Sequence, residues 1–210
     1  MIRMLIVEDH AAIADALAAL LASADDLQVD VVCRDKECAE AQLLTDPPDV
    51  VLCDVMLGGR DRGFELLRAF GADVAFVMYT AFEFPAYHAQ AIEYGARGYV
   101  SKTAPIAEIQ HAIRRAAAGK HAFPQRVLDS ARAAATPPTA RELFAIRLVA
   151  DGATNDEIAD GLGLRVKSVE GTLRRLFDRY GVNNRTQLVA LATRQGWLSS
   201  SDGVTPAAPG

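Results

Sequence analysis

Residues 4–10 read MLIVEDH, an apolar run of strand length that ends in two carboxylates. Further apolar runs of this kind lie at residues 29–33, 50–53, 74–79 and 98–100, and Ala-rich segments with helical spacing separate them. Such an alternation predicts crossover helices between parallel strands, and therefore a doubly wound α/β sheet covered on both faces. We expect a five-stranded parallel sheet with strand order 2-1-3-4-5.

In this flavodoxin-like order the carboxyl ends of the strands meet at one edge of the sheet. Glu8 and Asp9 follow the first strand, Asp54 the third, Thr80 the fourth and Lys102 the fifth. Asp54 is expected at the centre, because the third strand lies between the first and the fourth. Three adjacent carboxylates repel one another, and a hard divalent cation relieves that repulsion, so we expect Mg²⁺ as the cofactor. A carboxylate beside Mg²⁺ can accept a phosphoryl group as an acyl phosphate, and Lys102 would help to neutralise its oxygens.

Each of these residues taken singly has a commoner role, since aspartate and threonine at a strand end usually cap a turn or a helix. We favour a functional site because five suitable residues follow four strands of one sheet. Two neighbouring residues are expected to be structural. Cys53 should be a small buried apolar side chain, and His10 should lie in the first turn of the first helix rather than at the metal.

Four segments resemble the motifs of a response-regulator receiver domain. They are LIVEDH at residues 5–10, VVLCDVML at 50–57, VMYTAF at 77–82 and GYVSKT at 98–103. The resemblance covers residues 1–120.

This resemblance implies roles for individual residues. Asp54 is expected to be the phosphoacceptor, Thr80 to sense the phosphoryl group and Lys102 to pair with it. Tyr99 matches the aromatic residue whose rotamer couples to Thr80. The implied metal ligands are the carboxylates of Glu8, Asp9 and Asp54 and the backbone carbonyl of Met56.

Residues 139–198 change to a purely helical pattern, and three of the helix starts carry a capping pair. Gly161 and Gly163 are expected to break one helix, after which residues 166–180 form the next. Helix, short turn and helix is the arrangement that lays its second helix in the major groove of DNA. The capping pairs are Thr139 with Glu142, Thr154 with Glu157, and Asn184 with Gln187.

The helix at 166–180 has one apolar face, which predicts a core contact and leaves its polar residues to face outward. Glu170 and Arg174, four residues apart, would also suit an ordinary surface ion pair in a protein that never meets DNA. Arg174 and Arg175 are the preferred phosphate contacts, and Arg179 is expected to face outward as well. The predicted DNA-contacting residues are Lys167, Ser168, Glu170, Gly171, Thr172, Arg174 and Arg175.

Residues 137–198 are similar in sequence and spacing to the LuxR-type four-helix DNA-binding domain of NarL/FixJ response regulators. The resemblance supports residues 166–180 as the helix that enters the major groove. It also implies that the helix at 184–194 pairs two DNA-bound subunits, so that two half-sites about one helical turn apart would be recognised.

Length and composition exclude several other classes of protein. The chain has 210 residues, of which 50% are hydrophobic and 23% charged, so it has the material for packed cores. A net charge of −5 excludes a uniformly basic protein that coats nucleic acid. No run approaches the roughly 18 apolar residues of a membrane span, and we expect no membrane partner. The three cysteines, Cys33, Cys38 and Cys53, form neither an even disulfide framework nor a paired zinc signature, which favours a cytoplasmic location.

The sequence therefore predicts a two-component response regulator rather than an enzyme, with at most self-catalysed phosphotransfer and autodephosphorylation. A sensor histidine kinase would phosphorylate Asp54, and an active homodimer would bind double-stranded promoter DNA, with RNA polymerase as a further candidate partner. The expected parts are a receiver at 1–120, a linker with some helix at 121–138, the DNA-binding domain at 139–198 and a disordered tail at 199–210.

Three alternatives stay open. The chain could be an adaptor that binds proteins through its helical domain, or a regulator that binds DNA without phosphorylation. It could also be a small Mg²⁺-dependent phosphatase or a flavin protein on the same sheet. Against the last pair, no second aspartate stands two residues after Asp54, and no flavin-binding loop is evident.

Overall fold

The computed structural model describes residues 1–195 and 197–198, so the predicted tail at 199–210 lies outside the described residues. The chain forms two compact units, Met1–Ala135 and Thr136–Gly210. No helix in the described part of the chain is both long and apolar enough to cross a membrane.

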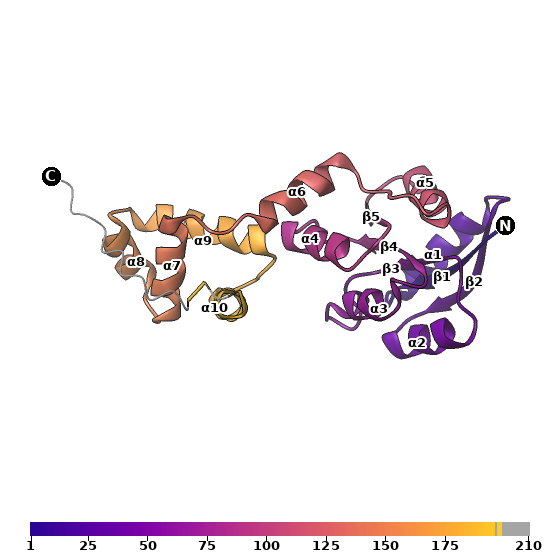
Figure 1. Cartoon of the computed structure of the whole chain (residues 1–210), viewed down its shortest axis with the longest axis horizontal. Coiled ribbons are helices and arrows are strands. Elements are labelled where there is room, and N and C mark those ends of the chain that lie inside the picture. The colour runs from indigo at the N-terminus through magenta and orange to yellow at the C-terminus, as the bar shows by residue number, and fades with distance from the viewer. Residues whose placement is uncertain (196, 199–210) are drawn as a thin grey trace. The chain divides into compact units, whose positions relative to one another are not determined.

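The first unit is built on the predicted sheet. Its five strands are all parallel and follow the order β2-β1-β3-β4-β5, which confirms the expected topology (Figure 1). The central strands are buried along most of their length, as expected for a parallel sheet with both faces covered. The strands are β1 (Ile2–Val7), β2 (Leu27–Cys33), β3 (Val50–Cys53), β4 (Ala75–Thr80) and β5 (Gly98–Ser101).

Helices cover both faces of this sheet, and each face has its own hydrophobic core (Figure 1). Helices α1 and α5 bury their apolar residues in one core, and α2, α3, α4 and α6 contribute to the other. The helices are α1 (Ala11–Ala22), α2 (Lys36–Thr45), α3 (Arg62–Phe70), α4 (Pro85–Glu93), α5 (Ile106–Ala117) and α6 (Gln125–Ala135).

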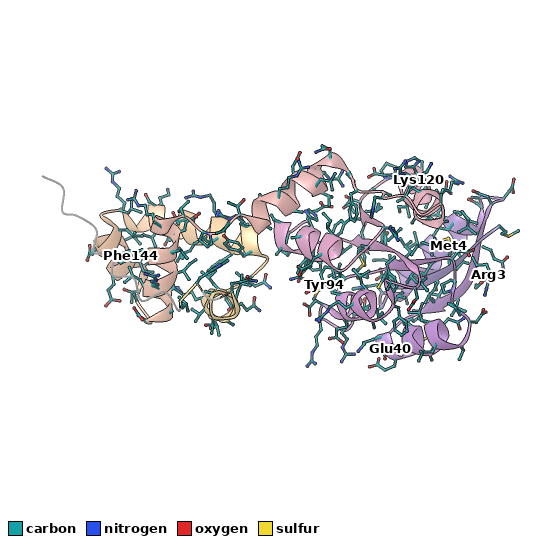
Figure 2. All side chains as sticks on the ribbon, viewed as in Figure 1. Arg3, Met4, Glu40, Tyr94, Lys120 and Phe144 are labelled. Atoms are coloured by element: carbon teal, nitrogen blue, oxygen red, sulfur yellow. A yellow bond between two sulfur atoms is a disulfide. The ribbon has the colours of Figure 1, made fainter. Side chains whose placement is uncertain are left out.

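Strand β1 shows why the two cores fix the register. Side chains alternate across a strand, so Met4, labelled in Figure 2, and Ile6 enter the core of α1 and α5. Leu5 and Val7 enter the opposite core. Because both sets are completely buried, a shift of one residue would exchange the two faces, and the ends of the strands are held in one register.

Residues 121–135, most of the segment predicted to be a linker with some helix, belong to the first unit. Helix α6 belongs to the first unit, and its Val127 is fully buried in the same core as Tyr99. The chain before α6 pairs with the end of the sheet, since Ala122 donates to the Arg97 carbonyl at 2.6 Å and forms a parallel bridge with Gly98. The boundary between the units therefore falls at residues 135–136.

Two of the three cysteines form a disulfide, which their odd number and spacing did not predict. Cys33, the last residue of β2, is bonded to Cys38 in the first turn of α2. Asp35 caps that helix by accepting from the Cys38 backbone N–H at 2.7 Å, and this tight turn brings the two cysteines together. Cys53 is free and completely buried, in agreement with its predicted structural role.

The second unit is helical. Thr139 with Glu142 and Thr154 with Glu157 form complete capping boxes, as predicted. Asn184 accepts from the Gln187 N–H, but the Gln187 side chain accepts from Asn183 instead, so that pair is only half of a box. The described helices are α7 (Ala140–Ala150), α8 (Asn155–Leu162), α9 (Val166–Tyr180) and α10 (Arg185–Arg194).

The helix-turn-helix consists of α8, a short turn and α9. Gly163 ends α8 with φ of 62°, a left-handed conformation that suits glycine. Gly161 does not break the helix as predicted; it lies within α8, where a β-carbon would stand 3.2 Å from Leu148 of α7. Its small size therefore allows the two helices to approach closely.

Candidate functional site

The sheet register places the expected polar residues side by side at its carboxyl edge. Val7 of β1 is opposite Cys53 of β3, so the residues that follow them, Glu8 and Asp54, leave the sheet together. The backbone continues the ladder, because Asp54 N–H donates to the Val7 carbonyl at 2.9 Å. Lys102 N–H likewise donates to the Thr80 carbonyl at 2.9 Å.

Lys102 joins two buried carboxylates. Its Nζ lies 2.7 Å from Asp54 Oδ2 and 2.6 Å from Glu8 Oε2. The Glu8 side chain is 0% exposed and that of Asp54 is 4% exposed. Such short contacts in a buried setting are strong electrostatic interactions, and they hold the Asp54 carboxylate in one orientation.

Burial and the charge of the partner act in opposite directions on the pKa of Asp54 and on the pKa of Lys102. Burial raises the pKa of Asp54 and the charge of Glu8 raises it further, while the hydrogen bond and charge of Lys102 oppose the shift. Burial by itself lowers the pKa of Lys102, but its hydrogen bonds to Asp54 and Glu8 outweigh burial, so the pKa of Lys102 is raised. The ammonium group therefore stays charged beside a carboxylate that is costly to ionise.

Four side chains form a cluster with the donors that a divalent cation needs. One ligand atom each from Glu8, Asp9, His10 and Asp54 lies within 4.8 Å of the others. Asp9 Oδ2 accepts from the Gly58 N–H at 2.9 Å, which ties the cluster to the loop after β3. Oxygen-rich donors of this kind fit Mg²⁺.

The position of His10 differs from the one predicted from the sequence. His10 precedes α1 as the N-cap residue instead of lying in the first turn, and its ring reaches the acidic cluster. His10 Nδ1 lies 2.8 Å from Asp9 Oδ1 and 3.0 Å from Glu8 Oε1. The position of His10 next to Asp9 in the sequence could have indicated that its ring lies near the acidic cluster.

Thr80 and Tyr99 are linked through one residue that the sequence analysis missed. The Phe82 N–H donates to Thr80 Oγ1 at 3.3 Å, and the Tyr99 hydroxyl donates to the Phe82 carbonyl at 2.5 Å. Both Thr80 and Tyr99 are completely buried. The Tyr99 ring packs edge-on against His88, with 4.6 Å between centroids. Movement of Phe82 would therefore disturb both side chains.

Met56 contacts the site through its backbone. Its N–H donates to Asp54 Oδ1 at 3.2 Å, and the predicted role of its carbonyl as a metal ligand stays a prediction. The loop that follows turns at Gly58 and Gly59, whose φ angles of 62° and 73° favour glycine. Leu57 and Arg60 bridge across this turn.

Gly63 is a second residue that the sequence analysis missed. A β-carbon there would lie 2.0 Å from the Asp54 carbonyl oxygen and 2.9 Å from the Val55 Cα, so no side chain fits. We expect Gly63→Ala to lower the free energy of unfolding of the first unit by about 3 kcal/mol, because backbone atoms must move to admit the methyl group. Urea denaturation would measure the change.

Gly59→Ala is the matched control for this prediction. It makes the same substitution four residues earlier, in the loop before α3, at a position with no atom within 4 Å. Only its positive φ opposes the methyl group, and the expected loss is about 1 kcal/mol. Equal losses for the two variants would contradict the close approach at Gly63.

The exposed face of α9 carries most of the predicted DNA-contacting residues. Lys167, Ser168, Glu170, Arg174 and Arg175 are exposed. Gly171 and Thr172 are half-buried, and Val169, Leu173, Leu176 and Tyr180 form the buried face. Within the described chain, no ion pair joins Glu170 to Arg174 at 4 Å or less, so the ordinary surface pair is not formed.

A groove of about 570 Å³ runs beside this face of α9. Basic and hydroxyl side chains from α7 and α9 meet there beside Glu142, and they include Arg141, Lys167, Thr172 and Arg175. Arg175 Nη2 donates to Thr172 Oγ1 at 3.1 Å, which holds the guanidinium over the groove. Such a set of donors suits the phosphate oxygens of a nucleic-acid backbone.

Arg179 does not belong to the exposed set. It is half-buried, and its Nη2 lies 3.1 Å from Glu142 Oε2, the same carboxylate that completes the capping box of α7. The guanidinium also stacks over the Tyr180 ring at 5.0 Å. Arg179 therefore ties α9 to the start of α7, and the prediction that it faces outward was wrong.

Comparison with known proteins matches each of the two units to a protein family. Residues 4–114 match the family model of the response regulator receiver domain, and residues 138–192 match that of the bacterial regulatory proteins of the luxR family. The transcriptional regulatory protein LiaR of Bacillus subtilis is 31% identical, over 92% of this chain and 98% of its own. DesR of the same organism is 29% identical, over 94% of this chain and 100% of its own.

Solved structures share the fold. The response regulator ChrA of a heme-sensing two-component system is 26% identical, with a TM-score of 0.53 over 93% of this chain and 98% of its own. The response regulator RcsB, solved in complex with DNA, has a TM-score of 0.67 at 19% identity, over 95% of this chain and 98% of its own. The chain is thus a two-component response regulator. It belongs to the family that joins a receiver domain to a LuxR-type DNA-binding domain.

Proposed function

We propose that a sensor histidine kinase phosphorylates Asp54 and that phosphorylation controls the binding of promoter DNA by the helical domain. The observation that carries this proposal is the contact of Lys102 with both Glu8 and Asp54, inside an acidic cluster at the carboxyl edge of the sheet. A lysine held against a buried carboxylate is arranged to neutralise a phosphoryl group on that carboxylate.

The acidic cluster is proposed to hold Mg²⁺ through Glu8, Asp9 and Asp54, with the Met56 carbonyl as a further ligand. When bound, the cation would reduce the repulsion between phosphoryl oxygens and the carboxylates. An Asp54 carboxylate oxygen attacks the phosphorus, forming an O–P bond, while the bond from phosphorus to the donor breaks and its electrons leave with the donor. Lys102 pairs with the transferred oxygens. The receiver thus catalyses its own phosphorylation and, with water as the acceptor, its dephosphorylation.

The switch is proposed to run from Thr80 to Tyr99. A phosphoryl group on Asp54 would offer oxygens to the Thr80 hydroxyl, which now accepts from the Phe82 N–H. Movement of Thr80 would weaken that bond and, through the Phe82 carbonyl, the bond from Tyr99. This is a population shift between two arrangements of buried side chains.

The helical domain is proposed to place α9 in the major groove, with Arg174, Arg175 and Lys167 on phosphates and the other exposed residues toward the bases. Helix α10 would pair two DNA-bound copies, so the active form is a homodimer, and RNA polymerase is a further candidate partner. A cytoplasmic location stays a prediction from the sequence.

A protein-binding adaptor is the second candidate, and the exposed Glu170 among the basic residues of α9 favours it, because a carboxylate near phosphates opposes DNA binding. Capture of genomic fragments separates the two functions. We expect the wild-type chain with Mg²⁺ and a small phosphodonor to enrich a few promoter fragments, and to enrich them more weakly without the donor. Enrichment no greater than that of Arg174→Ala/Arg175→Ala would contradict DNA binding.

A further inference from the structure

The bonded cysteines Cys33 and Cys38 lie outside the acidic cluster and have no part in the proposed phosphotransfer. We propose that they are a redox modification site: a disulfide that forms and breaks reversibly in the folded receiver, entered through the exposed Cys38. The reactants that it would meet are low-molecular-weight disulfides and thiols.

Contacts of the backbone, separate from the disulfide, position both residues. Cys33 is fixed in the sheet opposite Val7, and the Cys38 N–H is held by the Asp35 side chain at 2.7 Å. Their Cα atoms are 5.5 Å apart, within the range that a disulfide requires. The reduced thiols therefore need no change of fold to form the bond again.

The two sulfur atoms differ in access. Cys33 is 0% exposed, whereas Cys38 lies on the exposed side of the first turn of α2. A dissolved reagent can reach Cys38 first, and Cys33 can then react only with Cys38. The remaining cysteine, Cys53, is completely buried at the end of β3. A dissolved disulfide or thiol therefore cannot reach it in the folded receiver.

The chemistry is thiol–disulfide exchange in two steps. The Cys38 thiolate attacks a disulfide RSSR, so that a bond forms between Cys38 and one RS group and the other leaves as RS⁻. The Cys33 thiol loses its proton and attacks the Cys38 sulfur, which releases the second RS⁻. Two cysteine thiols are oxidised, RSSR is reduced, and the two protons end on two RSH.

The site lies one hydrogen bond from the acidic cluster. The Glu8 N–H donates to the Cys33 carbonyl at 3.0 Å, so the strand end that the disulfide joins to α2 also positions the backbone of Glu8. Arg34, between the cysteines, pairs with Asp15 of α1 at 3.0 Å. The segment from Cys33 to Cys38 thus contacts the end of β1 through the Cys33 carbonyl and α1 through Arg34.

A redox titration tests the proposal. The full chain is equilibrated with mixtures of reduced and oxidised glutathione, quenched with acid, denatured, alkylated and weighed by mass spectrometry. We expect three alkyl groups in the reduced form and one, on Cys53, in the oxidised form, with the same endpoints from either direction. Three alkyl groups in every mixture, one alkyl group even in excess dithiothreitol, or a disulfide that contains Cys53 would overturn it.

Two matched variants test the point of entry. In oxidised glutathione, folded Cys33→Ser should gain one glutathione on Cys38, while folded Cys38→Ser should stay unmodified because Cys33 is buried. Circular dichroism checks that each variant is folded, and Cys33→Ala replaces Cys33→Ser if the buried hydroxyl prevents folding. Modification of Cys33 in Cys38→Ser, together with no modification of Cys38 in Cys33→Ser, would overturn the proposal.

Discussion

Asp54→Asn is expected to abolish phosphorylation. With Mg²⁺ and a small phosphodonor, the wild-type chain should gain one phosphoryl group that hydroxylamine removes, and the variant should gain none. The reason is that an amide oxygen is a poor nucleophile, although Asn keeps the shape of the buried side chain and can still accept from the Met56 N–H. Intact-protein mass spectrometry with phosphodonor would measure the stoichiometry.

Asp61→Asn is the control for this experiment. Asp61 lies in the loop that follows Asp54, is exposed, and makes no side-chain cap for α3. We expect that variant to be labelled as the wild type is. If Asp54→Asn carries the same label as the wild type, the carboxylate that accepts the phosphoryl group is another one, and the role assigned to Lys102 fails with it.

Arg174→Ala should weaken DNA binding without loss of stability. Removal of one charge-assisted phosphate contact is expected to lower the affinity about tenfold, or about 1.4 kcal/mol. The slope of log affinity against log salt concentration should fall by about 1, since one fewer counterion is released. Fluorescence anisotropy over a series of salt concentrations would measure both, with a promoter fragment found by genomic capture.

Arg179→Ala separates contact with DNA from support of the domain. Arg179 is on the same helix but is paired with Glu142, so its loss should lower the free energy of unfolding of the helical domain by about 1 kcal/mol. The salt slope should not change. An unchanged affinity for Arg174→Ala, or a reduced salt slope for Arg179→Ala, would contradict this division of roles.

The sequence was sufficient for the fold of the first unit, because parallel strands buried on both faces leave continuous apolar runs that are visible in one dimension. It also predicted that Asp54, Thr80 and Lys102 lie at one edge of the sheet, since the strand order brings the carboxyl ends of β3, β4 and β5 side by side. The helix starts at Thr139 and Thr154 could also be predicted from the sequence, because a capping box is a local interaction within four residues.

Only the tertiary structure decided which side chains are used for packing and which stay available. Arg174 and Arg179 look alike in the sequence, but of the two only Arg179 forms an ion pair with Glu142 of α7. The close approach of Gly63 to the Asp54 backbone, the link between Phe82 and Tyr99 and the packing of α6 likewise depend on contacts between separate elements. Local patterns specify the elements through the backbone's own periodicity, but the partners of a side chain exist only once the elements have packed.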